Sequence, residues 1–192
     1  MIHKSGEYSR AVTEEESSAM STLIADITFE FRRHKELADR AIAGLSDEAF
    51  FRRPADQVNP IALIVKHVAG NLASRWADFL STDGEKPTRD RDAEFILTPD
   101  DSRSNLLMAW DRGWSILFAT LATLIEADLV KTVTVRGESL RAQQALLRGL
   151  NHAAYHVGQI LYIARIMKPD AEYLTVPPGQ SRQVAGGYLK PR

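Results

Sequence analysis

Apolar residues recur at helical spacing through four long segments of this chain, and this periodicity constrains the fold more than any other feature. Steps of three and four residues place side chains on one face of an α-helix. The pattern predicts helices over residues 14–43, from Asn59-Pro60 to about Leu80, from Thr98-Pro99 to about Glu126, and from Ser139 to Met167. Such helices bury their apolar faces against one another, so we expect an all-α fold, a four-helix bundle.

The segments between these helices carry turn and capping signals. Ser46 followed by two acids predicts a short helical turn, and KTVTVRGES predicts a brief extended or hairpin segment. The charged stretch 81–95 is expected to be a solvated loop, although a loop of that length can also cover a site or a dimer contact. We therefore predict a single domain over residues 1–192, with a core at about 14–168 and an irregular tail at 169–192.

Composition excludes several classes of function. The net charge is −1, which provides no general attraction for nucleic acid or an anionic membrane. The chain has no cysteine, so it forms no disulfide, thiolate zinc site or cysteine nucleophile. The N-terminal segment is polar and no apolar run is long enough for a membrane span, so we expect a cytoplasmic protein.

The stretch NHAAYHVGQI places two of the five histidines, His152 and His156, one helical turn apart. Both lie at the flank of the apolar sector of the fourth helix, and His67 lies at the corresponding flank of the second. Neutral imidazole is a good ligand for divalent transition metals. Three protein ligands leave a coordination position open, as in catalytic zinc sites, so we predict a three-histidine metal site if these two flanks meet.

Polar residues next to His67 on the second helix could support such a site. Asn71 and Asp78 could accept the second ring N–H of His67 and so orient it. Arg75 could hold a carboxylate substrate, but we expect it to pair with Asp78 or with an acid of the loop.

Three further positions bear on the site or on its packing. On the fourth helix, Gln159 could hydrogen-bond a ligand or a substrate, and Gly158 is expected to allow close helix packing. His34, on the core-facing stripe of the first helix, is a candidate fourth ligand or general base, but we favour an interior, hydrogen-bonded histidine there. The three tryptophans are expected in the core or in the wall of a cleft.

A different interpretation of the histidines stays open. An HxxxH pair on a helix also occurs where two partly buried imidazoles bond to backbone or carboxylate groups. In that case the protein is a non-catalytic helical module, a dimer whose histidines are structural or whose metal only stabilises the fold. Bound metal with an open coordination position would distinguish the enzyme from this alternative.

NHAAYHVGQI resembles the last-helix pattern HxxxHxGQI of the DinB/YfiT-like family of metalloenzymes. NPIALIVKHVAGNLASRWADFLSTDGEKPTRDRDAEF resembles the second helix and following loop of an uncharacterised branch of that family, and RGESLRAQQALLRGL also fits. The resemblance covers about residues 20–180.

The resemblance implies an up-down-down-up bundle with one divalent metal held by His67, His152 and His156, and often a homodimer. Zinc is expected first, with nickel or iron as alternatives. Relatives in other branches use the metal to bring a low-molecular-weight thiol to an electrophile, as S-transferases or isomerases, and others are described as hydrolases. We therefore expect a small-molecule substrate, with thiol-dependent transfer or isomerisation first and metal-assisted hydrolysis second.

Overall fold

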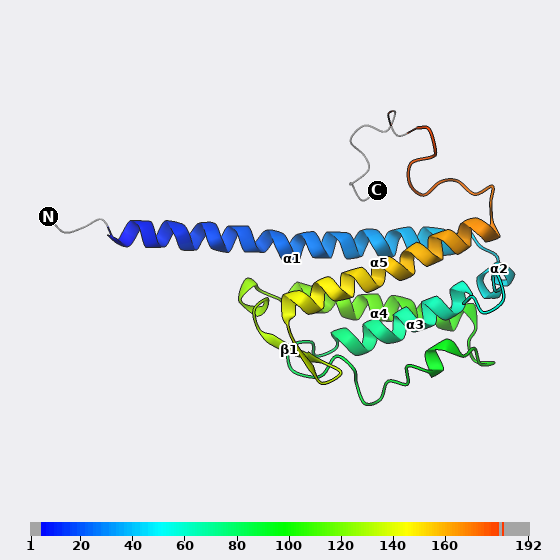
Figure 1. The fold of residues 1–192 in the computed structure, drawn as a ribbon, viewed down its shortest axis with the longest axis horizontal. Helices are drawn as coiled ribbons and strands as arrows, with labels where there is room; N and C mark the ends of the chain where they lie inside the picture. The colour runs from blue at the N-terminus through cyan, green and yellow to red at the C-terminus, as the bar shows by residue number, and fades with distance from the viewer. Residues whose placement is uncertain (1–4, 181, 183–192) are drawn as a thin grey trace.

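The computed structural model of this protein describes residues 5–180 and 182, with side chains described from residue 23 onward. The described chain is mostly helical, with one small two-stranded sheet, which agrees with an all-α assignment in the broad sense (Figure 1). The elements are α1 (Ser5–Ala43), α2 (Asp47–Phe51), α3 (Ile61–Trp76), η1 (Ala93–Phe95), α4 (Arg103–Thr123), η2 (Glu126–Asp128), β1 (Thr132–Val135), β2 (Glu138–Arg141) and α5 (Ala142–Met167).

The four long helices lie side by side in two parallel pairs (Figure 1). In the first pair α3 and α4 run the same way, since Lys66 bonds to Asp101 just before α4 and the Thr120 hydroxyl, near its end, donates to the carbonyl of Trp76. In the second pair α1 and α5 end together, where the Lys168 ammonium donates to the carbonyl of Gly44. The two pairs run in opposite directions.

Aromatic side chains fill the centre of the helical body. Phe31 of α1 lies edge-on to both Trp76 of α3 and Trp114 of α4, with ring centroids 6.0 and 6.2 Å apart. All three rings are buried, and the indole N–H of buried Trp110 donates to the Asp39 carboxylate at 2.8 Å. The expectation that the tryptophans belong to the core is confirmed.

Two helices begin later than the capping signals predict. Asp101 accepts hydrogen bonds from the backbone and hydroxyl of Thr98, so that segment forms a turn. Ser102 caps α4 instead, accepting from the backbone N–H of Asn105. Ser139 does not cap α5, because it pairs with Thr134 across the hairpin β1–β2. The predicted hairpin segment itself is confirmed.

Helix α3 ends at Trp76, about four residues before the predicted end. Ala77 is extended and Asp78 has a φ of 51°, in the left-handed region that closes a helix, and the Asp78 carbonyl accepts from the backbone of Ser81 and Thr82. The chain then crosses the length of the body as residues 77–102, which we call the crossover loop (Figure 1).

The crossover loop is fastened at both sides. The Ser74 hydroxyl donates to the carbonyl of Gly84 and accepts from the backbone of Lys86. Asp83 accepts from the backbone N–H groups of Arg136 and Gly137 in the hairpin turn, both at 2.8 Å. The prediction of a solvated loop holds only in part: residues 87–88 and 90–93 are exposed, whereas these bonds tie the loop to α3 and to the hairpin.

Neither helix nor strand occurs at residues 169–180 and 182, in line with the predicted irregular tail there, and the remaining tail positions lie outside the described residues. Within the described chain no helix is both long and apolar enough to cross a lipid bilayer.

Candidate metal centre

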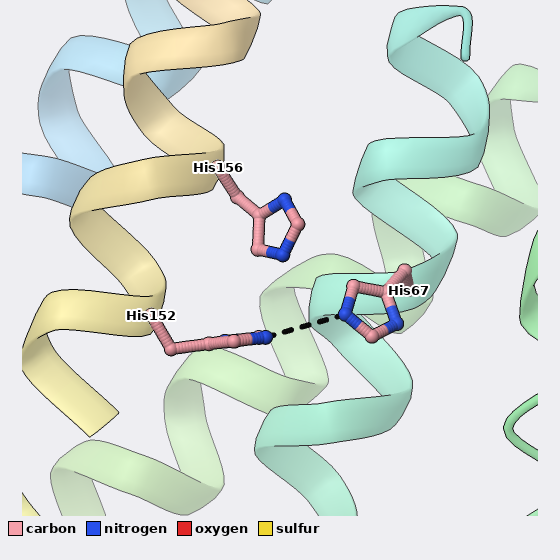
Figure 2. Close-up of side chains that lie close together, drawn as sticks. All are labelled: His67, His152 and His156. Atoms are coloured by element: carbon pink, nitrogen blue, oxygen red, sulfur yellow. Dashed lines mark hydrogen bonds between the residues drawn. The ribbon is translucent and has the colours of Figure 1, made fainter. Parts of the chain in front are cut away.

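Three imidazoles from two helices converge between α3 and α5, as Figure 2 shows. The Nε2 atoms of His67 and His152 are 3.3 Å apart, and the ring centroids of His156 lie 4.9 and 4.6 Å from those of His67 and His152. One ring nitrogen from each histidine lies within 4.8 Å of the others. The antiparallel packing of α3 on α5 thus brings together the three histidines singled out in the sequence.

Glu94 of η1 sets the orientation of His67. Its carboxylate lies 2.8 Å from His67 Nδ1, and both side chains are buried. Burial acts to raise the pKa of Glu94, but the hydrogen bonds from His67 and Arg89 outweigh it and hold that pKa below its ordinary value. An ionised carboxylate only accepts, so Nδ1 carries the proton and Nε2 of a neutral His67 presents its lone pair toward His152.

Arg89 fixes the same carboxylate from its other side. Its Nε and Nη2 donate to the two oxygens of Glu94 at 2.7 and 2.8 Å, and its Nη1 donates to Glu85 at 3.0 Å. The Arg89 side chain is only 4% exposed. A bidentate Arg–carboxylate pair of this kind defines position as well as charge, so Glu94 is held rigidly behind His67.

Gly70 provides the space for this arrangement. A Cβ built at Gly70 would overlap a carboxylate oxygen of Glu94 and would lie 2.8 Å from its Cδ. Because Gly70 lies nearly one turn after His67 on α3, any side chain there would push Glu94 away from the imidazole.

His156 is oriented by its own helix. Its Nδ1 lies 2.9 Å from the Oε1 of Gln159, an oxygen that accepts, so His156 Nδ1 carries the proton and Nε2 is free to bind. Burial lowers the pKa of His156, and burial followed by the neighbouring charges lowers the pKa of His152 to about 3. Both rings are therefore neutral at physiological pH, the form that binds metal.

The donor set fits a divalent transition metal. A zinc–nitrogen distance of about 2.0–2.1 Å separates tetrahedral ligand nitrogens by about 3.3 Å, which is the distance between Nε2 of His67 and of His152. Two of the three rings have an acceptor at Nδ1, the arrangement that orients ligating histidines. The same imidazoles suit nickel or iron.

A pocket of about 590 Å³ opens beside two of the three histidines. His67 and His152 line it, together with Asn71 and Arg75 of α3. Arg75 is 8% exposed, and in the described part of the chain its guanidinium makes no hydrogen bond or ion pair. The predicted ion pair with Asp78 or a loop acid is therefore wrong: Asp78 is exposed in the turn after α3.

The other sequence candidates have different surroundings from those expected. Neither Asn71 nor Asp78 bonds to His67, because Glu94 occupies its Nδ1. His34 is half-buried, is not among the clustered histidines, and its Nδ1 has no partner among the described residues, so it is not the hydrogen-bonded interior histidine considered above. Gly158 is exposed with nothing within 4 Å of an added Cβ, so its predicted packing role is wrong.

Sequence reasoning did not find Glu94 or Arg89. Both lie in the crossover loop, where no period relates a residue to the face of a helix. The only local signal was the alternation of acids and bases in KPTRDRDAEF, which is more typical of a solvated segment.

Comparison with solved structures finds a similar fold in a conserved protein of Enterococcus faecalis. The two chains are 15% identical, the TM-score is 0.57, and the match covers 75% of this chain and 96% of the other. No curated protein matches. The model of one family, described as a protein of unknown function (DUF1572), matches residues 18–180. This match spans α1 from residue 18 onward, the other helices, the crossover loop and the three histidines, and the chain therefore belongs to the DUF1572 family.

Proposed function

We propose that this protein is a metal-dependent enzyme on a DinB-like four-helix bundle, with His67, His152 and His156 binding one divalent ion. One observation carries the proposal: three imidazoles approach one another, and two of them have an acceptor at Nδ1 that leaves Nε2 for the metal. The order of helix directions, with α3 and α4 parallel, is that of an up-down-down-up bundle and supports the DinB-like assignment.

Within this proposal the reaction is the transfer or isomerisation of a small molecule with a low-molecular-weight thiol. When bound, the metal lowers the pKa of a thiol or water beside it, since three neutral ligands leave its full charge in place. The chain has no cysteine, so the thiol comes from solution. The pocket beside His67 and His152 provides room for thiol and substrate together.

Elemental analysis tests the metal site directly. Protein purified without a histidine tag or chelator is expected to hold close to one equivalent of zinc, with nickel or iron as alternatives, and the His152→Ala/His156→Ala variant is expected to hold little. Equal metal in the variant, or none in the parent after each ion is added back, would contradict the site. In that case the non-catalytic helical module would be the better interpretation.

Whether turnover requires an added thiol distinguishes a transferase or isomerase from a hydrolase. Turnover of electrophilic substrates only when a thiol is added supports transfer or isomerisation, whereas turnover in water alone supports a hydrolase. Both assays use the metal-loaded parent, with the double-histidine variant as the control.

We also propose that the protein is a homodimer, as the resemblance implies. Tyr155, Tyr162 and Ile166 of α5 are 68, 71 and 46% exposed and recur at helical spacing, so they form an apolar stripe that a second copy could cover. Sedimentation velocity distinguishes the dimer from the monomer.

A further inference from the structure

The pocket beside the candidate metal centre is lined by four arginines and by no carboxylate. Arg75 comes from α3, Arg91 from the crossover loop, Arg136 from the hairpin turn and Arg148 from α5. Four separate segments of the chain thus direct cationic side chains to one hollow. Acidic residues balance basic ones over the whole chain, with a net charge of −1, so the absence of carboxylates among the residues that line this pocket is a local feature.

Arg75 is the centre of this arrangement. It is 8% exposed, its Nε is buried without a partner, and it forms no ion pair with a described residue. A Cβ at Gly84 would lie 3.0 Å from Arg75 Cδ, so the stem of Arg75 is packed closely against the crossover loop. Burying a guanidinium group without a partner costs free energy. An anion bound in the pocket would remove that cost.

The other three arginines are only weakly engaged. Arg136 lies 3.4 Å from Glu85, and Arg148 lies 3.9 Å from exposed Glu138. Arg91 lies over the ring of Phe95 at 5.5 Å. Their guanidinium groups therefore retain donors for a ligand, and the planar fork of arginine matches the oxygens of carboxylate and phosphate groups.

We propose that this pocket binds a small molecule with two or more anionic groups, either carboxylates or phosphates, with one group on Arg75. The pocket volume of about 590 Å³ suits a small molecule rather than a nucleic acid. His67 and His152 also line the pocket, so a ligand held by the arginines has its other end at the histidines. This placement as a substrate rests on the proposed function, whereas anion binding itself does not.

Isothermal titration calorimetry on the full chain tests the inference. The probes are succinate and pyrophosphate, with neutral succinamide as the uncharged match of succinate. We expect saturable binding of at least one anion at one site, and none of succinamide. Binding of succinate alone identifies a carboxylate ligand, and binding of pyrophosphate alone identifies a phosphate ligand.

Three variants separate the pocket from general charge. Arg75→Met keeps the packed stem and is expected to weaken anion binding at least tenfold, which corresponds to about 1.4 kcal/mol. Arg136→Gln changes a side chain that is 51% exposed, and is expected to weaken binding about twofold to fivefold. Arg112→Gln, at an exposed position of α4 outside the pocket, should bind as the parent does.

Failure of both probes to bind the parent, or equal binding by Arg75→Met, Arg136→Gln and parent, would overturn the inference. Titrations on both metal-loaded and chelator-treated protein keep this result apart from the proposed function. Anion binding without any metal uptake would contradict the metal site alone, and metal uptake without anion binding would contradict the arginine pocket alone.

Discussion

At the scale of single residues, Glu94 is the link between the crossover loop and the imidazoles. Its two oxygens receive Arg89 from one side and His67 from the other, all within 2.8 Å. This arrangement fixes both the tautomer of His67 and the direction of its ring. A carboxylate in this position also raises the basicity of the imidazole that it contacts, which strengthens a metal–nitrogen bond.

We predict that Glu94→Gln weakens metal binding about 10- to 100-fold. The amide has the same shape but no charge, and it cannot hold both Arg89 and the protonated Nδ1 of His67 as well as a carboxylate does. Competition with a chromophoric zinc chelator measures the change. Glu172→Gln, an exposed carboxylate of the tail, is the control. Equal zinc affinity in Glu94→Gln and in the parent would show that His67 needs no such support.

The sequence contains enough information to place the histidines but not Glu94. A helix fixes the angle between residues, so the flank positions of His67, His152 and His156 follow from their spacing once the apolar face is known. Glu94 reaches His67 across 27 residues of chain that include most of the crossover loop. The path of a loop depends on long-range contacts such as those of Asp83 with the hairpin turn, which no local pattern encodes.

At the scale of elements, one glycine in each of the two histidine-bearing helices shows how much the surroundings of a helix face can differ. Gly70 of α3 faces Glu94 so closely that no side chain fits, whereas Gly158 of α5 faces open space. Adding a side chain at Gly70 would therefore disturb the site, whereas adding one at Gly158 would not, although both residues lie in helices that carry the histidines. Sequence periodicity could not separate them, because the space beyond a helix face depends on what packs there.

We predict that Gly70→Ala weakens zinc binding in the same direction as Glu94→Gln, because the new methyl group displaces the carboxylate. Gly158→Ala, the matched control, should leave zinc affinity unchanged and raise the free energy of unfolding by about 0.5–1 kcal/mol, since alanine favours the helix. Chelator competition and urea unfolding measure the two quantities. Loss of zinc in Gly158→Ala, or full affinity in Gly70→Ala, would contradict this assignment.

The existence of the long helices was predictable from the sequence, as were the last residues of α1 and α5, but the first residues of α4 and α5 were not. Asp101 illustrates the reason. Its carboxylate accepts from Thr98 and also pairs with Lys66 of α3 at 2.7 Å. An acid that locally resembles a residue of the first helical turn is therefore used in a contact between α3 and the segment before α4. The first residue of α4 consequently depends on where α3 lies.

At the scale of the whole molecule, the neutral histidines link stability to pH. The pKa of His152 is about 3 in the folded protein and near 6.5 when the ring is free. Between these values the unfolded chain binds a proton that the folded chain does not. The contribution of neutral His152 to the free energy of unfolding is therefore fully present above about pH 6.5, and it decreases as the pH falls toward 3.

We predict that the metal-free protein loses stability between pH 7 and pH 5, and that His152→Asn reduces this loss. Glu94, whose pKa is also lowered, adds a further loss only below its ordinary value of 4.5, so the two effects separate by pH. Urea unfolding in chelator at pH 7, 6 and 5 measures the trend. A His152→Asn variant with the same pH dependence as the parent would show that another group is responsible.

The parallel arrangement of α3 and α4 has a consequence for how the lengths of such chains can vary. Two helices that start at the same end need a connection that returns along the whole body, and here that connection also holds Glu94 behind His67 and Asp83 beneath the hairpin. Insertions in the turn at Ser81–Thr82 precede these anchor points and leave them free to form. Deletions between Asp83 and Glu94 would shorten the segment that carries both anchor points, so Glu94 could no longer reach His67 while Asp83 stays bound to the hairpin turn.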